Sequence, residues 1–313
     1  MSDRAPPTDH THADCLHRFS FEHTPVRGQW VRLRDSIADA EAGKTYPTPV
    51  KRLLNQMFAA VAMFADNLKF EGAVALQSKG NGALIRSLAE CREQKYLRGI
   101  AHLDEALARP ANENNLADWL NNGQLALSLI PPADSQQAPY QGMVPLEMAS
   151  LSENLEVYLR DSEQLPSRLY LADGPNSVTG LLLQRLPSSD LASEIDLGQA
   201  DDDWQSIVTL ADTVTDRELT TLPPTDMLSR LFAEYPCRIF PARHLTFRCT
   251  CSRSKSDRTL RVLPDEDLLA LLEELGQVEV DCEFCGTRYS YDRVDIGQLL
   301  SAPPHPHGDS NLH

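Results

Sequence analysis

Apolar residues up to about residue 187 recur with two periods, one typical of helices and one typical of strands. Between residues 50 and 64 the apolar positions stand mostly three or four apart, which predicts an amphipathic helix. Pro49 stands at its start, where the missing N–H of proline costs nothing. Alternating or short apolar runs bounded by turn residues predict strands. The expected strands cover residues 31–33, 73–77, 124–130, 168–171 and 180–184, and a second helix is expected at residues 151–159.

These helices and strands do not follow the strict βαβ order of a parallel sheet. The pattern therefore predicts an α+β fold, with an N-terminal mixed α/β domain at residues 15–187 built on a mostly antiparallel sheet. Residues 1–14 are polar and proline-bearing and are expected to form a flexible tail. A helical linker and a small cysteine-rich C-terminal domain complete the expected organisation.

The character of the chain changes at residues 188–236, which we interpret as an acidic helical linker. Residues 190–235 hold eleven carboxylates against two arginines, a local net charge of −9. Helices with such self-repulsion are expected to be stable only when docked, in part on the C-terminal domain, so the linker could be released. An ordinary pair of surface helices is the alternative interpretation.

Two apolar stripes with helical spacing predict the helices of this linker. The first runs from Trp204 to Val214, with the three aspartates at residues 201–203 expected at its N-terminus, where they complement the helix dipole. The second follows a pair of prolines and covers residues 227–235.

Two cysteine pairs near the C-terminus carry the most specific chemical signal. Cys249 and Cys251 are separated by one residue, thirty residues follow, and Cys282 and Cys285 form a Cys-x-x-Cys pair. Zinc prefers four thiolate or imidazole ligands in a tetrahedron, and two close thiol pairs supply them with little strain. Gly286 fits a turn whose backbone N–H groups face the sulfurs. We therefore predict that these four cysteines bind one Zn²⁺ ion per chain in the reduced state.

The predicted zinc-binding domain covers residues 237–300 and has too little core to fold reliably alone. An amphipathic helix is expected between the cysteine pairs, beginning after Pro264 and ending at Gly276. Zinc would supply on the order of 10–16 kcal/mol of apparent binding free energy, which is enough to hold the domain folded. Residues 301–313 contain prolines and histidines and are expected to form a second flexible tail.

Basic residues near the first cysteine pair change its expected reactivity. Cations lower the pKa of thiols and favour thiolates, which are both metal ligands and nucleophiles toward oxidants. The same cations could instead form a solvated face or contact nucleic acid. His244 is an alternative ligand that four thiols make superfluous, and Cys15, Cys91 and Cys237 are isolated and expected to be packed thiols. The basic residues are Arg243, Arg248, Arg253, Lys255, Arg258 and Arg261.

Composition and charge narrow the class of protein. The chain has 313 residues and a formal net charge of −16, which opposes binding to phosphate backbones. No run approaches the roughly 18 apolar residues that span a bilayer, and residues 1–14 contain no apolar core of a signal peptide. We therefore predict a cytoplasmic protein that binds neither nucleic acid nor membrane and whose thiols serve metal binding or redox chemistry. An enzyme is not predicted, because no glycine-rich phosphate loop, Ser-His-Asp set or catalytic carboxylate pair is found.

Several short sequence blocks occur along the chain in an order that is more specific for one protein family than the cysteine spacing alone. They are LHRF at residues 16–19, VRG at 26–28, YPTPV at 46–50, YQG at 140–142, SEQLP at 162–166, CTCSR at 249–253 and LPDE at 263–266. With these blocks and the cysteines, nearly the whole chain resembles the redox-regulated heat-shock protein 33 family, also called the 33 kDa chaperonins. Ser254 departs from the family pattern, in which an acid is common, and this changes only the local charge.

The resemblance implies a holdase chaperone that is inactive when reduced and zinc-bound. Oxidants such as hypochlorous acid, or peroxide combined with heat, would form the disulfides Cys249–Cys251 and Cys282–Cys285 and release the zinc. The linker would then unfold and expose apolar surface to unfolding client proteins. A homodimer is expected in the oxidised state.

Two other classes of protein compete with this interpretation. A zinc-ribbon adaptor for nucleic acid is favoured by the basic residues, but residues 237–300 hold nine basic against eleven acidic residues. A thiol-disulfide oxidoreductase would use Cys282 and Cys285 as its catalytic pair. That pair does not open a helix after a strand in a βαβ pattern, and two further thiols stay unexplained. The redox-regulated chaperone is therefore the preferred hypothesis.

Overall fold

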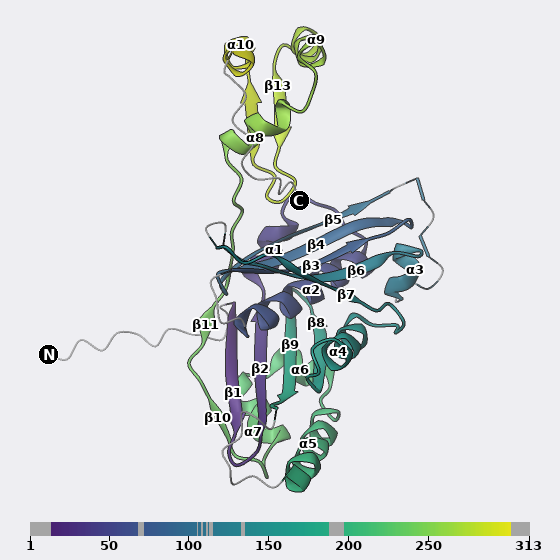
Figure 1. Cartoon of the computed structure of the whole chain (residues 1–313), viewed down its shortest axis with the longest axis vertical. Coiled ribbons are helices and arrows are strands. Elements are labelled where there is room, and N and C mark those ends of the chain that lie inside the picture. Colours follow the sequence, from purple (N-terminus) through teal and green to yellow (C-terminus); the bar gives the residue numbers. More distant parts are fainter. Residues whose placement is uncertain are drawn as a thin grey trace, which may run out of the picture. The chain divides into compact units, whose positions relative to one another are not determined.

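The computed structural model describes residues 14–67, 72–104, 106–107, 109–110, 112, 115–132, 135–187 and 197–301 (Figure 1). The chain divides into two compact units, Met1–Arg248 and Cys249–His313. Apart from Asp14 and Ser301, the predicted tails lie outside the described residues, and so do residues 188–196 of the predicted linker.

Sheet A of the first unit joins strands from separate stretches of the chain. Its order is β10-β1-β2-β9-β8, every neighbouring pair is antiparallel, and β11 also pairs with β1. The predicted strands at residues 31–33, 168–171 and 180–184 are confirmed as parts of β2, β8 and β9. The strands of sheet A are β1 (Cys15–Phe21), β2 (Val26–Leu33), β8 (Ser167–Gly174), β9 (Ser177–Arg185), β10 (Cys237–Ile239) and β11 (Arg243–His244).

Sheet B of the first unit has the order β12-β5-β4-β3-β6-β7. Its pairs are antiparallel except for β12 and β5, which run parallel. The predicted strands at residues 73–77 and 124–130 lie in β3 and β6, and the predominance of antiparallel pairing confirms the α+β class. The strands of sheet B are β3 (Ala73–Lys79), β4 (Leu84–Arg92), β5 (Tyr96–Leu103), β6 (Gln124–Ile130), β7 (Tyr140–Val144) and β12 (Thr246–Phe247).

Helix α2 (Thr48–Asp66) lies between the two sheets and forms the centre of the core (Figure 1). Every residue from Met57 to Asp66 is buried, as expected of a helix that other elements cover on all sides. The close approach of α2 to both sheets depends on glycines in the strands. A Cβ on Gly99 of β5 would lie 2.6 Å from the Phe58 ring, and one on Gly180 of β9 would lie 2.7 Å from Met63. The helix predicted at residues 50–64 is therefore confirmed.

Three shorter helices complete the α/β part of the first unit: α1 (Asp35–Glu41), α3 (Leu116–Leu120) and α4 (Leu151–Asp161). Helix α4 confirms the helix predicted at residues 151–159, and Ser150 and Glu153 form a capping box at its start. Asp14, at the end of the predicted tail, is buried. Its carboxylate accepts hydrogen bonds of 2.6, 3.1 and 2.6 Å from the backbone N–H groups of residues 34, 35 and 36, and so anchors the start of α1.

The linker helices α5 (Leu197–Ala211), α6 (Asp216–Thr221) and α7 (Pro224–Leu231) pack on sheet A through their apolar faces (Figure 1). Sheet A supplies a surface on which these faces dock, because it presents large aromatic and aliphatic side chains to them. The buried cluster contains Trp204, Ile207, Ala211, Leu219, Met227, Leu228 and Phe232 of the linker with Phe19, Phe21, Val26, Trp30, Leu181 and Leu183 of the sheet.

The bounds of the linker helices differ from the sequence prediction. Helix α5 begins at Leu197, so the aspartates at residues 201–203 lie within the helix rather than at its N-terminus. Helix α7 ends at Leu231, before the expected end at residue 235. The sequence pattern misses α6, although Thr215 and Glu218 form a capping box with a recognisable spacing.

The strands β10, β11 and β12 connect the linker to the first cysteine pair and belong to the first unit. The compact units thus divide at Arg248, which differs from the boundary at residues 236/237 drawn from the sequence. Because these strands have two or three residues each, they are too short to show a periodic pattern from which they could be predicted.

The described residues of the second unit form three helices and one hairpin. Its core is a cluster of seven buried residues, including Leu268, Leu272 and Tyr291. Helix α9 is the helix expected after Pro264, and it ends at Gly276 in a left-handed conformation. No helix in the described part of either unit is long and apolar enough to cross a membrane. The elements are α8 (Arg253–Leu260), α9 (Asp265–Leu275), β13 (Val278–Asp281), β14 (Arg288–Tyr291) and α10 (Arg293–Ser301).

Candidate metal centre

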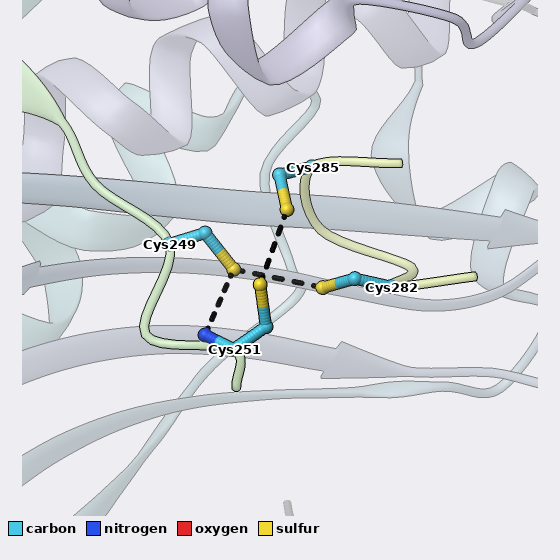
Figure 2. A group of neighbouring side chains, drawn as sticks. All are labelled: Cys249, Cys251, Cys282 and Cys285. Atoms are coloured by element: carbon cyan, nitrogen blue, oxygen red, sulfur yellow. Dashed lines mark hydrogen bonds between the residues drawn. The ribbon is translucent and has the colours of Figure 1, made fainter. Parts of the chain in front are cut away.

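Two loops of the second unit bring the four predicted cysteine ligands together (Figure 2). Cys249 and Cys251 lie directly before α8, whose N-cap residue Ser252 accepts a hydrogen bond from the third residue of the helix. Cys282 and Cys285 lie in the turn of the β13–β14 hairpin. Each loop therefore ends at a regular element that fixes where its sulfurs lie.

The hairpin turn is closed by backbone hydrogen bonds around the second cysteine pair. The Cys282 N–H donates to the Thr287 carbonyl at 2.9 Å, and the Gly286 N–H donates to the Cys282 carbonyl at 2.7 Å. Gly286 has a φ of 70°, which glycine adopts without strain. The N–H groups of Phe284 and Cys285 donate to the Cys282 sulfur. The turn expected from the glycine after Cys285, with amides facing a sulfur, is therefore confirmed.

The four sulfurs form a compact cluster, which we call the sulfur cluster. All four Sγ atoms lie within 4.8 Å of one another. The Sγ atoms of Cys249 and Cys282 are 3.6 Å apart, and those of Cys251 and Cys285 are 3.4 Å apart (Figure 2). Zn–S bonds of about 2.3 Å in a tetrahedron place sulfurs about 3.8 Å apart. The sulfur cluster therefore fits one tetrahedral ion, and the four cysteines could hold a metal.

Hydrogen bonds to individual sulfurs stabilise their negatively charged thiolate form. The backbone N–H of Cys251 lies 3.4 Å from Cys249 Sγ, and the Thr287 hydroxyl lies 3.2 Å from Cys285 Sγ. A hydrogen bond to the charged form of a thiol favours that form. Thr287 is a site residue that the sequence analysis does not single out, and its place two residues after the last cysteine is the signal that could have found it.

The pKa shifts of the thiols reflect burial and crowding. Burial raises the pKa of Cys249 and of Cys282. Burial also acts to raise the pKa of Cys285, but hydrogen bonds from Thr287 and from neighbouring thiols outweigh it and lower the pKa to about 7. Four thiolates at such short separations repel one another, and a divalent cation is the group that makes them compatible.

The basic residues expected around the first cysteine pair are divided between the two units. Arg243 and Arg248 belong to the first unit. Arg243 forms an ion pair of 2.8 Å with the buried carboxylate of Asp66, and the Arg248 guanidinium lies 4.6 Å from the centre of the Tyr96 ring. The charge of Arg243 is thus compensated by a carboxylate.

The other four basic residues lie on or beside α8, a helix that the sequence pattern misses. Arg253 forms an ion pair of 2.9 Å with Asp295 and stacks on Tyr291, with its guanidinium carbon 4.4 Å from the ring centre. The Lys255 ammonium donates to the Thr250 hydroxyl at 3.0 Å, beside both cysteines of the first pair.

The remaining candidate ligands lie elsewhere. His244 is on β11 of the first unit, opposite Cys15 of β1, and within the described residues the potential metal-binding group consists of the four cysteines. Cys15 and Cys91 are buried, and Cys237 is partly buried. Burial raises the pKa of all three thiols, that of Cys91 to about 12. The prediction that they are packed thiols is therefore confirmed for Cys15 and Cys91.

Comparison with known proteins agrees with this arrangement. The model of the Hsp33 protein family matches residues 14–292. The chain is 40% identical over 289 residues to the 33 kDa chaperonin of Pseudomonas syringae pv. tomato, covering 92% of this chain and 94% of that relative. It is 38% identical over 288 residues to the 33 kDa chaperonin of Nitrosococcus oceani, covering 92% and 94%.

The match over nearly the whole chain defines the class of protein as a chaperone. The chain belongs to the Hsp33 family, which confirms the resemblance drawn from its sequence blocks. The crystal structure of the 33 kDa chaperonin (heat shock protein 33 homolog) from Thermotoga maritima aligns with a TM-score of 0.74 at 23% identity, covering 92% of this chain and 98% of that chain. At this identity the likeness supports the fold.

Proposed function

We propose that this member of the Hsp33 family is a redox-regulated holdase of the cytoplasm. In the reduced, inactive state Cys249, Cys251, Cys282 and Cys285 hold one Zn²⁺ ion as thiolates. Oxidation converts them to the disulfides Cys249–Cys251 and Cys282–Cys285 and releases the ion. The linker helices then leave sheet A, and the apolar surfaces so exposed bind unfolding client proteins. The observation that carries the proposal is the sulfur cluster, whose four Sγ atoms lie within 4.8 Å of one another.

The redox step balances without a further cofactor. Two thiolates react with one hypochlorous acid and one proton to give a disulfide, chloride and water, so the two sulfur atoms are oxidised and chlorine is reduced. Two equivalents of oxidant therefore convert all four cysteines. Every sulfur of the cluster lies close to the other three, so the pairing within each loop rests on the family resemblance and is open to direct mapping.

In this proposal the second unit is the part of the chain whose folding depends on its sulfur ligands. In the part of this unit that the structure describes, seven buried residues form the core, too few to offset the conformational entropy of a unit of this size. Zinc, when bound, joins the loop before α8 to the β13–β14 turn and stabilises four thiolates. Without it the two loops share no covalent link, because each proposed disulfide closes within one loop.

The first unit holds the surface that the proposal makes available to clients. Phe21 of β1 meets Phe232, which follows α7, edge to face with ring centres 4.9 Å apart. Trp204 of α5 and Met227 of α7 are buried in the same cluster against sheet A. Removing the linker helices would expose this aromatic surface, and an apolar patch rimmed by charge is suited to binding unfolded chains.

Polar contacts hold the linker with modest strength, as a releasable element requires. Asp212, after α5, accepts hydrogen bonds from Arg168 Nη2 at 2.8 Å and from the Tyr170 hydroxyl at 2.6 Å. Asp201 of α5 also forms an ion pair with Arg185. Exposed ion pairs contribute about 1 kcal/mol or less, so they orient the helices without fixing them permanently.

The path from the linker helices to the second unit runs through β10, β11 and β12 of the first unit. The Arg248 N–H donates to the Leu97 carbonyl at 2.9 Å, directly before the first ligand cysteine. In the proposed mechanism, unfolding of the second unit frays this end first and then reaches the linker helices. A homodimer of oxidised chains would bury part of the surface exposed in this way.

The first test follows zinc and chaperone activity together. Zinc release is measured with a chromophoric chelator, and aggregation of citrate synthase is followed by light scattering, before and after treatment with hypochlorous acid. We expect one Zn²⁺ released per chain with a gain of holdase activity, reversed by reductant and zinc. Peptide mapping by mass spectrometry identifies the disulfides. Cys237→Ser is the matched control, because it removes a thiol outside the sulfur cluster.

Two outcomes would contradict the proposal. Zinc release without holdase activity would leave a structural zinc module and favour a nucleic-acid adaptor. Unchanged proteolysis of the linker after oxidation and zinc loss would refute the coupling between the two units.

A further inference from the structure

Arg32 is a buried arginine on the face of sheet A that carries the linker helices. It follows Trp30 by two residues on β2, so both side chains point to the same face of the sheet. Arg32 is 9% exposed, and its guanidinium carbon lies 4.7 Å from the centre of the Trp30 ring. Trp30 belongs to the apolar cluster beneath the linker helices. A cation in this place needs polar partners within the protein.

The linker supplies two of these partners. Arg32 Nη2 donates to the carbonyl oxygens of Leu219 at 3.0 Å and Leu222 at 2.8 Å, at the C-terminal end of α6. Arg32 Nε donates to the Thr179 hydroxyl of β9 at 3.3 Å. Among the described residues no carboxylate forms an ion pair with Arg32, so its charge is balanced by carbonyl dipoles at a helix C-terminus. In keeping with this, burial lowers the pKa of Arg32.

The residues after α6 explain why these carbonyl oxygens are available. In a continuing helix the Leu219 carbonyl would accept a hydrogen bond from the N–H of residue 223. Residue 223 is a proline without an N–H, and Pro224 follows it. Leu222 leaves the helical conformation with a ψ of 145°. The chain therefore cannot satisfy the buried Leu219 carbonyl locally, and Arg32 does so from the sheet.

We propose that Arg32 is a positioning residue that holds the linker on sheet A by donating to two carbonyl oxygens that lie side by side only while α6 is folded. This inference rests on the proposed function, in which release of the linker exposes the client-binding surface. Unfolding of α6 removes both acceptors at once and leaves a buried cation with one hydroxyl partner. Folding of α6 and covering of sheet A are therefore coupled through one side chain.

The first experiment measures docking of the linker independently of zinc and oxidation. Arg32→Met in the full chain, reduced and loaded with zinc, is compared with the wild type by hydrogen exchange and mass spectrometry. Loss of hydrogen bonds to a charged group should speed exchange in α6 by about 10- to 100-fold, with exchange in α2 unchanged. Wild-type exchange in α6 would overturn the inference. Equal acceleration in α2 and α6 would also overturn it, since this would mean general destabilisation.

Milder variants keep the test informative if Arg32→Met folds poorly. Arg32→Lys retains a donor and the charge, so it should restore part of the protection of α6. Thr179→Val removes only the hydroxyl acceptor of Arg32 Nε and should speed exchange in α6 less than Arg32→Met does. Arg86→Met removes an exposed arginine from β4 of sheet B and is the matched control, expected to behave as the wild type. Equal exchange in the Met and Lys variants would contradict the positioning role.

The second experiment asks whether this docking controls activity. Suppression of citrate synthase aggregation is measured under reducing conditions, with zinc content determined in the same samples. Arg32→Met should gain holdase activity while it retains zinc. Release of α6 without any gain of activity would leave the positioning role standing and contradict the proposed function. A gain of activity with α6 still protected would overturn the positioning role alone.

Discussion

The two compact units of this protein are stabilised by different means. Among the described residues of the first unit, 38 are buried in one apolar cluster around α2 and 15 in another beneath the linker helices. Among the described residues of the second unit, seven are buried in one apolar cluster, and four cysteine sulfurs lie close together. A large core is stabilised by burial spread over many side chains, which oxidation of a few thiols does not remove, whereas a fold that depends on a metal can be lost when its ligands are oxidised. The difference teaches where a redox switch can be built.

The linker helices stand between these extremes. Their apolar faces are buried like a core, but their charges repel one another and the ion pairs that hold α5 lie at the surface. We therefore expect the linker helices to have a lower free energy of opening than α2, because fewer contacts must be broken to release them.

The largest effect is expected from removing one sulfur of the cluster. Cys251→Ser should abolish stable metal binding. Because structural zinc contributes on the order of 10–16 kcal/mol of apparent folding free energy, the second unit should then unfold while the first unit keeps its structure. Hydrogen exchange over both units checks this, with Cys237→Ser as the control. Persistent protection of α9 in Cys251→Ser would show that the second unit does not depend on the metal.

The next largest effect should come from opening a cavity in the first unit. Phe58→Ala removes a fully buried ring from α2 and should cost about 3–5 kcal/mol of unfolding free energy. Zinc content and the exchange rates of the second unit should not change, because the substitution lies in the core of the other unit. Urea denaturation followed by circular dichroism, with Phe58→Leu as a milder control, measures the cost. Loss of zinc in Phe58→Ala would show that the two units are not independent.

A pH-dependent effect of intermediate size is expected at Asp173 of β8. Gln56 donates to its carboxylate at 2.8 Å, Arg52 lies 3.7 Å away, and Asp216 of α6 faces it from the linker. Burial is the largest influence and raises the pKa of Asp173 from 3.8 to about 6. The folded state therefore keeps a proton that the unfolded state has lost, so stability should fall as pH rises from about 4 to about 6.

Asp173→Asn tests this by removing the ionisation while keeping the shape and an acceptor for Gln56. The variant should lose the decline between about pH 4 and 6 and should be more stable than the wild type at pH 7 by about 1–3 kcal/mol. Urea midpoints measured from pH 4 to 7.5 give the comparison. Parallel pH profiles of variant and wild type would contradict the assignment.

The smallest effect is expected at the surface anchor of the linker. Asp212→Asn weakens the contacts with Arg168 and Tyr170, which are exposed, and should loosen α5 by about 1 kcal/mol or less. Raising the salt concentration should produce a similar change in the wild type and little change in the variant. Hydrogen exchange of α5 resolves a difference of this size. A loss as large as that of Phe58→Ala would mean that Asp212 is a structural rather than a releasable anchor.

Elements in which a periodic pattern extends over many residues were predictable from the sequence. Short elements, and elements that form by pairing with a distant part of the chain, were not. Helix α2 shows helical spacing along most of its 19 residues, so its prediction depended on local pattern alone. Strand β10 has three residues, and it forms only because Ile239 pairs with Phe19, more than two hundred residues away. Helix α6 has six residues, too few to display a period. Local periodicity cannot report pairing that depends on the path of the whole chain.

At the candidate metal centre, too, the residues with a local pattern were predictable, and those that depend on distant contacts were not. The spacing of Cys249, Cys251, Cys282 and Cys285 pointed to four ligands because close pairs of cysteines have few other uses in a reducing compartment. Arg32 could not be singled out, because its partners are backbone carbonyl oxygens of a helix that the pattern misses.

The sequence by itself determined the α+β class, the helices and strands with clear periodicity, the cysteine set and the family. These depend on residue type and on spacing within a few turns of chain. Tertiary structure alone decided that the linker helices pack on sheet A, that β10 to β12 join the first unit, and that Arg32 donates to the carbonyl oxygens at the end of α6. These features depend on contacts between residues far apart in the chain, whose free energy is gained only when the whole fold brings them together.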